Sequence, residues 1–476
     1  MNQPRRDSVK APVVCLPCRK QKRKCDKALP RCSLCVRLCR ECNYTTEAAP
    51  PNSEHLTLLR SYQLTPFAPA LIQENIKQQA FGLTGGESGC RASCMKYFES
   101  IHHWFPVLSK PKFMGRLPEL CRAPSAGQSL LVLCMLLLNT PPTESGISGQ
   151  ARSLYTLVKS SIALIQAGYE ASLELLQSQV LVKLFEVSHG IYPAAHDTNI
   201  ANTIRALAST SYGRLHLWEK NHEDGLAATE EVARIWQAVV ILNRYLGLQN
   251  SSTIYRTTEI LSPAQLFATD GLKSGMVEAT SVADLSANKT PLASLVEASR
   301  LLEQALTHVN NPTIRQDFNA AEAIQLIKTV IAYKHVLTES EVTSPSRLAS
   351  QVDICNSALL SVFELGNHLK IPQDISCHFS SGLFRDALID EVVSAATQFE
   401  GSLASTNLSD LCPFSLHPVL KAAVILASSS SNSDEFRRRQ SIESLKSVLR
   451  HSSKRWYIAK HYFMELQSVD SGIVTT

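Results

Sequence analysis

The 476-residue sequence has no apolar run long enough to cross a membrane and no apolar segment near its start. The longest apolar run, 130–138, is about half the length of a membrane-spanning helix, and it predicts a buried helix instead. The first ten residues, MNQPRRDSVK, have no apolar core, so we expect no secretory signal. Cysteines in a reducing intracellular compartment hold metal more often than disulfides. We therefore expect an intracellular protein with no membrane partner.

Enzyme motifs are also missing. The sequence has no HExxH pair, no GxSxG turn and no phosphate-binding loop. The candidates for acid–base or metal chemistry are scattered histidines, namely His102, His103, His189, His196, His216 and His222. Isolated histidines on helices are usually packing or surface residues. We predict that the protein is not an enzyme.

The positive charge is concentrated at one end of the chain. Residues 1–46 contain twelve basic and three acidic residues, a net charge of +9. Because the whole chain carries +5, the remaining residues carry −4. This asymmetry indicates that the first segment binds a polyanion and that the rest has a different role.

Seven of the 14 cysteines lie in this basic segment. Six of them form the pattern Cys-x2-Cys-x6-Cys twice, at Cys15, Cys18, Cys25, Cys32, Cys35 and Cys42. Six thiolates could hold one zinc ion with two sulfurs left over. They could also hold two ions, because two tetrahedral sites need eight ligand positions and two bridging sulfurs supply the difference. The repeat suggests Cys15 and Cys32 as the bridges.

Cys39 is a second candidate for the last ligand position. It lies three residues before Cys42, and the repeated x6 spacing favours Cys42. A segment this short cannot bury enough apolar surface to fold alone, so metal binding would supply its folding energy.

These residues resemble the fungal binuclear zinc cluster family of transcription factors. The likeness covers the six cysteines, the basic run between Cys18 and Cys25, Pro30 in the spacer and Tyr44 after the last cysteine. It implies two bound zinc ions and two short helices, one starting after each Cys-x2-Cys, with the basic run on the first. A nuclear location also follows from it.

The resemblance also implies recognition of double-stranded DNA. The basic run consists of Arg19, Lys20, Lys22, Arg23 and Lys24. In the family, a helix end enters the major groove and lysines before the third cysteine contact a CGG-like triplet. Lys22 has such a position, whereas Gln21 replaces the lysine often found beside it. The other four would contact phosphates or adjoin the thiolates. The alternative is a zinc-dependent protein-interaction adaptor without sequence-specific DNA binding.

Between the head and the body we predict a flexible linker. Its composition is loop-like from residue 47 and includes GLTGGESG at 82–89. A coiled coil that begins at Leu56 and Leu59 would end at Pro66 within about two turns. Long heptads are absent, and a homodimer through the body remains open.

From residue 90 to 476 the apolar periodicity is helical throughout. Examples are the stripes at Val232, Ile235, Val239 and at Leu173, Leu176, Val180. Three segments resemble the helical regulatory domain of fungal transcription factors: 97–108, 185–195 and 230–246. Residues 453–460 resemble the terminal helix of regulators of biosynthetic gene clusters.

We therefore predict a mostly α protein in three parts. Residues 1–46 form a zinc-nucleated two-helix DNA-binding head, 47–89 a linker, and 90–476 an all-helical regulatory domain. The predicted function is a transcription regulator of a metabolic or secondary-metabolite gene cluster. A small-molecule effector or a coregulator is a further possible partner of this domain. A helical enzyme with a DNA-binding appendage is the second alternative function.

Overall fold

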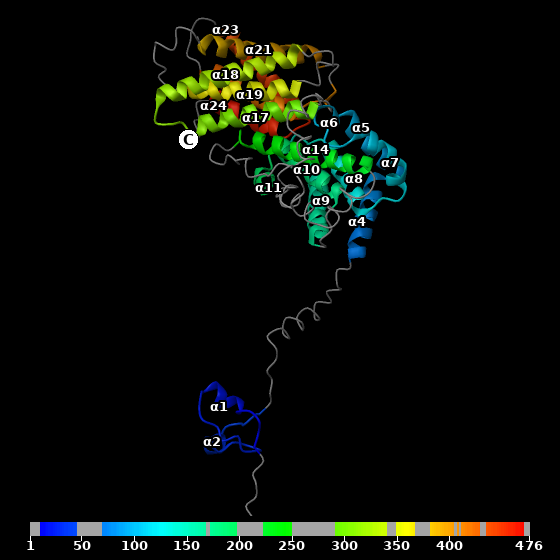
Figure 1. The fold of residues 1–476 in the computed structure, drawn as a ribbon, viewed down its shortest axis with the longest axis vertical. Coiled ribbons are helices and arrows are strands. Elements are labelled where there is room, and N and C mark those ends of the chain that lie inside the picture. Colours follow the sequence, from blue (N-terminus) through cyan, green and yellow to red (C-terminus); the bar gives the residue numbers. More distant parts are fainter. Residues whose placement is uncertain are drawn as a thin grey trace, which may run out of the picture. The chain divides into compact units, whose positions relative to one another are not determined.

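The structure is a computed structural model that describes residues 10–44, 69–167, 172–197, 222–249, 291–339, 349–366, 381–403, 407–408, 411–428 and 435–470. The chain divides into two compact units, 1–68 and 69–476, here called the head and the body (Figure 1). The described residues of both units are helical, with two isolated β-bridges, Lys10–Ala28 and Thr143–Gly146. The predicted mostly α fold class is confirmed.

The helices of the head are α1 (Leu16–Lys20) and α2 (Ser33–Arg37). The helices of the body are, in chain order, α4 (Pro69–Thr84), α5 (Glu87–Glu99), α6 (Ile101–Trp104), α7 (Lys110–Arg122), α8 (Ala126–Asn139), α9 (Gly149–Ala167), α10 (Leu173–His189), α11 (Tyr192–Asp197), α14 (His222–Leu246), α17 (Pro291–Asn310), α18 (Gln316–Glu339), α19 (Ala349–Gly366), α21 (Ser381–Ser402), the 3-10 helix η6 (Pro413–Ser415), α22 (Leu416–Ser428), α23 (Glu435–Ser452) and α24 (Ile458–Asp470).

The C-terminal part of the predicted linker is helical, which corrects that part of the prediction. Residues 69–84 form α4, and its buried Ile76 and Ala80 lie one turn apart on the face that packs against α8. Gly85 and Gly86 have φ of +76° and +94°, so the glycine-rich stretch is the turn between α4 and α5. The body therefore begins at residue 69. The predicted linker residues 47–68, with Leu56 and Leu59, lie outside the described residues.

The first half of the body is built around α8 and α10. The apolar run at 130–138 lies in α8, where all but one of its residues are buried, so the predicted buried helix is confirmed. Ser125 and Gln128 begin this helix with reciprocal hydrogen bonds between side chain and backbone. Of the described helices, none alone is long and apolar enough to cross a membrane, although the bent pair of α7 and α8 passes that test by length and composition only.

The second half of the body is a bundle of α17, α18, α19 and α21 to α24. Helix α14 joins the two halves because it packs against both α10 and α17. The predicted stripe along α14 faces the interior, with Val232, Ile235 and Val239 all buried. One continuous hydrophobic core extends through both halves.

The three segments that resemble a regulatory domain, together with 453–460, converge on one aromatic cluster. Trp104 lies edge-on to Trp456, with ring centroids 6.2 Å apart, and His189 lies 5.7 Å from the same indole. Tyr245 packs 4.7 Å from Phe414, which also contacts Trp104 at 5.8 Å. Side chains from all four segments therefore meet at the junction of the two halves of the body.

Candidate metal centre and nucleic-acid interface

The two halves of the head have the same backbone structure. Cys15 and Cys32 are the residues before α1 and α2, and both have extended backbones with φ of −62° and −68°. Each helix therefore begins inside its Cys-x2-Cys pair, which corrects the prediction that the helices start after the pairs. At α2 the reason is capping, because the Cys32 sulfur accepts the hydrogen bond of the Cys35 amide at 3.4 Å.

Both helices also end in the same way. The Arg23 amide donates to the Cys18 carbonyl at 2.9 Å, and the Arg40 amide donates to the Cys35 carbonyl at 3.0 Å. These bonds form Schellman motifs, in which one residue has a left-handed backbone. That residue is Lys22 in the first half and Cys39 in the second, both with φ of +48°.

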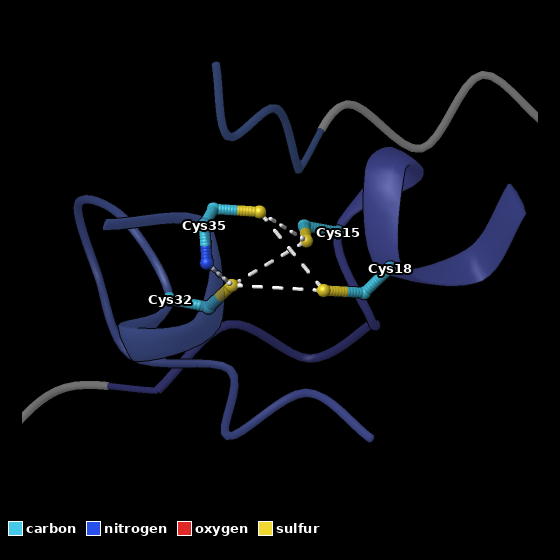
Figure 2. Close-up of side chains that lie close together, drawn as sticks. All are labelled: Cys15, Cys18, Cys32 and Cys35. Carbon is cyan, nitrogen blue, oxygen red and sulfur yellow. Dashed lines mark hydrogen bonds between the residues drawn. The ribbon is translucent and has the colours of Figure 1, made fainter. Parts of the chain in front are cut away.

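Four cysteines from the two halves point toward one another (Figure 2). The Cys15 sulfur lies 3.7 Å from the sulfurs of Cys32 and Cys35. The Cys18 sulfur lies 3.8 Å and 3.9 Å from the same two atoms. In a tetrahedral zinc site with Zn–S bonds of about 2.3 Å, neighbouring sulfurs are about 3.8 Å apart. The spacing of these sulfurs therefore fits shared coordination of zinc.

The two remaining cysteines of the pattern adjoin this group. The Cys25 sulfur lies 3.8 Å from that of Cys15, and the Cys42 sulfur accepts the Cys32 amide hydrogen bond at 3.2 Å. Cys15 and Cys32 thus have cysteine neighbours from both halves, as bridging ligands require. Cys39 is exposed and occupies the turn after α2.

The halves are also joined by hydrogen bonds around the cluster. The Asp26 carboxylate accepts the Ser33 amide at 3.1 Å and 3.2 Å, at the first residue of α2. The Ser33 hydroxyl also donates to this carboxylate, and its hydrogen bond, together with those from the amides, holds the pKa of Asp26 below its usual value. The Tyr44 hydroxyl donates to the Ala28 carbonyl at 2.8 Å, which ties the chain after the last cysteine to the spacer. The spacer contains a cis peptide bond at Leu29–Pro30.

The comparisons with known proteins agree with this geometry. Residues 13–50 match the fungal Zn(2)-Cys(6) binuclear cluster domain. A curated relative, transcription factor BOA15 of Botryotinia fuckeliana (strain B05.10), is 32% identical over 100 residues, which are 21% of this chain and 55% of that protein. The chain thus spans about half the length of this relative. No solved structure matches the chain.

The cofactor of the zinc cluster domain is a pair of zinc ions. Burial raises the pKa of the Cys15 and Cys32 thiols, in Cys32 to about 12. Zinc binds thiolates, so it must displace these protons, and its affinity falls as the pH falls. The buried core of the head consists of four cysteines, which provide too little apolar packing to hold the two halves together. Bound zinc would supply the cross-links between the halves.

The basic run lies on the surface of the first half. Arg19, Lys20, Lys22, Arg23 and Lys24 are all exposed, along α1 and the turn that follows it. A 17-residue offset relates the halves. The equivalent positions 36–41 have the sequence VRLCRE, with two basic residues and one acidic residue. The same backbone therefore presents five positive charges in one half and a net charge of +1 in the other.

Sequence reasoning missed that Cys39 is the counterpart of Lys22. The signal was present, because the offset between Cys15 and Cys32 also relates residues 22 and 39. The predicted histidine candidates do not form a site. Within the described residues, groups of three or more metal-ligating side chains occur in the head alone. His189 is buried against Phe185, and its Nδ1 accepts the Tyr457 amide hydrogen bond at 3.3 Å. His216 lies outside the described residues.

Proposed function

We propose that this protein is a nuclear transcription regulator that binds CGG-like triplets in the major groove of double-stranded DNA. Its zinc ligands are Cys15, Cys18, Cys25, Cys32, Cys35 and Cys42, with Cys15 and Cys32 bridging the two ions. The match of residues 13–50 to the zinc cluster domain and the sulfur spacing support this assignment. Cys39 takes no part, in agreement with its exposed position.

The observation that carries the proposal is the difference between the two halves of the head. Both helices follow an extended cysteine and end in the same turn, so the metal site does not require the basic residues of the first half. Five exposed positive charges in six positions create a concentrated positive potential that attracts a polyanionic partner. DNA phosphates supply that partner, whereas a protein-interaction adaptor has no such need.

Lys22 is the residue that we propose contacts base edges. Its left-handed backbone follows the C-cap residue Gln21 of α1, which places Lys22 in the middle of the basic run. A lysine ammonium donates well to guanine O6 and N7. Arg19, Lys20, Arg23 and Lys24 are proposed to contact phosphates, which positions Lys22 without selecting a sequence.

The body is proposed to act as the regulatory domain. The convergence of the three regulatory-like segments and 453–460 on one aromatic cluster supports this role, because that cluster joins the two halves of the body. Homodimerisation through the body is part of the proposal. The target genes would belong to a metabolic or secondary-metabolite biosynthetic gene cluster, as the resemblance at 453–460 suggests.

Selection of DNA by the zinc-loaded full chain from a random duplex library tests this function. We expect enrichment of CGG-like triplets, loss of all binding after chelation of zinc, and weaker binding at higher salt. The Lys22→Ala variant is expected to retain weak binding without the triplet preference. A zinc-loaded protein that enriches no sequence would refute the proposal and favour the adaptor.

A further inference from the structure

The body contains a cavity of about 340 Å³ between α18, α19, α21, α22 and α23. Its walls are mainly apolar, with Val352, Val392, Phe399, Pro418 and Val419 among the lining residues. This volume lies within the range of pockets that enclose small organic ligands. No residue that we have assigned to zinc or DNA lies in it.

Two polar side chains on one face of α19 line this cavity. Asn356 is 4% exposed, and its amide oxygen has no hydrogen-bond partner among the described residues. Asp353 lies one turn earlier on the same face and also lines the cavity. The Asn356 oxygen is itself buried, so Asp353 is the polar group of α19 that a ligand in the cavity would meet.

The two acids of the cavity indicate the charge of the ligand that it would bind. Glu391, the second acid of the cavity, is paired with Lys334 at 2.9 Å. No hydrogen bond or ion pair joins the Asp353 carboxylate to another described residue. Burial, with repulsion from Glu391, raises the pKa of Asp353 to about 7. A cationic ligand would pair with this carboxylate, whereas an anionic ligand would be repelled by both acids.

We propose that this cavity is a binding site for a small molecule with a protonated amine on an apolar or aromatic body. The ammonium group donates to the Asp353 carboxylate, and the apolar part packs between Val392, Phe399 and Val419. Because α19 packs against α17, α18, α21 and α22, a ligand held on its surface contacts the centre of the second bundle. A regulatory effect of binding rests on the proposed function, but binding itself does not.

Calorimetric titration of the zinc-loaded full chain tests the site with three probes that share one indole body. Tryptamine carries the amine, tryptophol a neutral hydroxyl and indoleacetate a carboxylate. We expect saturable binding of tryptamine, about tenfold weaker binding of tryptophol and none of indoleacetate. Equal affinity for tryptamine and tryptophol, or no binding of tryptamine, would overturn the proposal.

Two pairs of variants locate the binding. Asp353→Asn is expected to weaken tryptamine about tenfold, whereas Glu364→Gln, on the same helix but outside the cavity wall, leaves it unchanged. Ala395→Phe places a ring at an exposed position of the cavity wall and should abolish binding. Ser394→Phe, exposed on the same helix but not lining the cavity, is its control. Equal effects within either pair would refute the site.

DNA binding by the same preparations separates the two proposals. The four variants lie in the body and leave the zinc cluster and the basic run unchanged. Normal enrichment of CGG-like triplets without tryptamine binding would refute only the cavity proposal. Tryptamine binding without any enriched sequence would refute only the proposed DNA recognition.

Discussion

Replacement of Lys22 by glycine separates the fold of the head from its recognition of DNA. Lys22 has a left-handed backbone with φ of +48°, a conformation that costs an L-residue about 1–2 kcal/mol. Glycine removes that strain but loses about 0.5–1 kcal/mol more conformational entropy on folding. The Lys22→Gly variant should therefore fold as well as the original head, or be more stable by up to about 1.5 kcal/mol.

The same variant loses the side chain that we assign to base contact. A base contact of this kind contributes about 1–3 kcal/mol, so affinity for a CGG duplex should fall roughly 5- to 150-fold. Affinity for a scrambled duplex of the same composition should change little, because the other four basic residues still face the phosphates. Fluorescence anisotropy titrations on the two duplexes measure both values, and zinc analysis with thermal melting confirms the fold.

Cys39→Gly is the matched control because Cys39 has the same φ in the equivalent turn. It should gain similar stability and bind both duplexes as before. The assignment of Lys22 to base contact is refuted if Lys22→Gly weakens both duplexes equally, which would identify a phosphate contact. It is also refuted if the two glycine variants bind the CGG duplex equally well.

Three further predictions concern zinc, salt and pH. Cys42→Ala should abolish stoichiometric zinc binding and Cys39→Ala should preserve it, and metal analysis with the reverse result would overturn the ligand assignment. Lys20→Ala should reduce the slope of log affinity against log salt by about 0.9. An equal reduction by Arg37→Ala, at the equivalent position of the other half, would show that both halves face DNA. The raised pKa of Asp353, about 7, means that the folded body binds this proton more tightly than the unfolded chain does. Asp353 therefore lowers the free energy of unfolding increasingly as the pH rises from about 4 to 7. The Asp353→Asn variant should raise the melting temperature more at pH 8 than at pH 5. An equal gain at both values would contradict this.

The helices of the body show where apolar periodicity predicts a helix and where it fails to do so. The stripe at Val232, Ile235 and Val239 predicted α14 correctly, because a helix that packs on one side must repeat its apolar residues every three or four positions. The same rule failed to reveal α4. There only Ile76 and Ala80 are fully buried, and the glycines that follow made the segment resemble a flexible linker. Packing against α8 stabilises α4 despite this weak pattern.

The sequence by itself determined the metal chemistry of this protein and the positive charge of its head. Cysteine spacing is a local constraint, since a short chain can close around zinc in few ways, and the repeat of Cys15 and Cys32 already marks two equivalent halves. The tertiary structure alone decided which side chains meet across the body. Trp104 and Trp456 are in contact, and Asp353 and Asn356 face the residues of α21 and α22, because helices distant in the chain pack there. Such contacts depend on how all the helices fill one core, and no local spacing in the sequence encodes them.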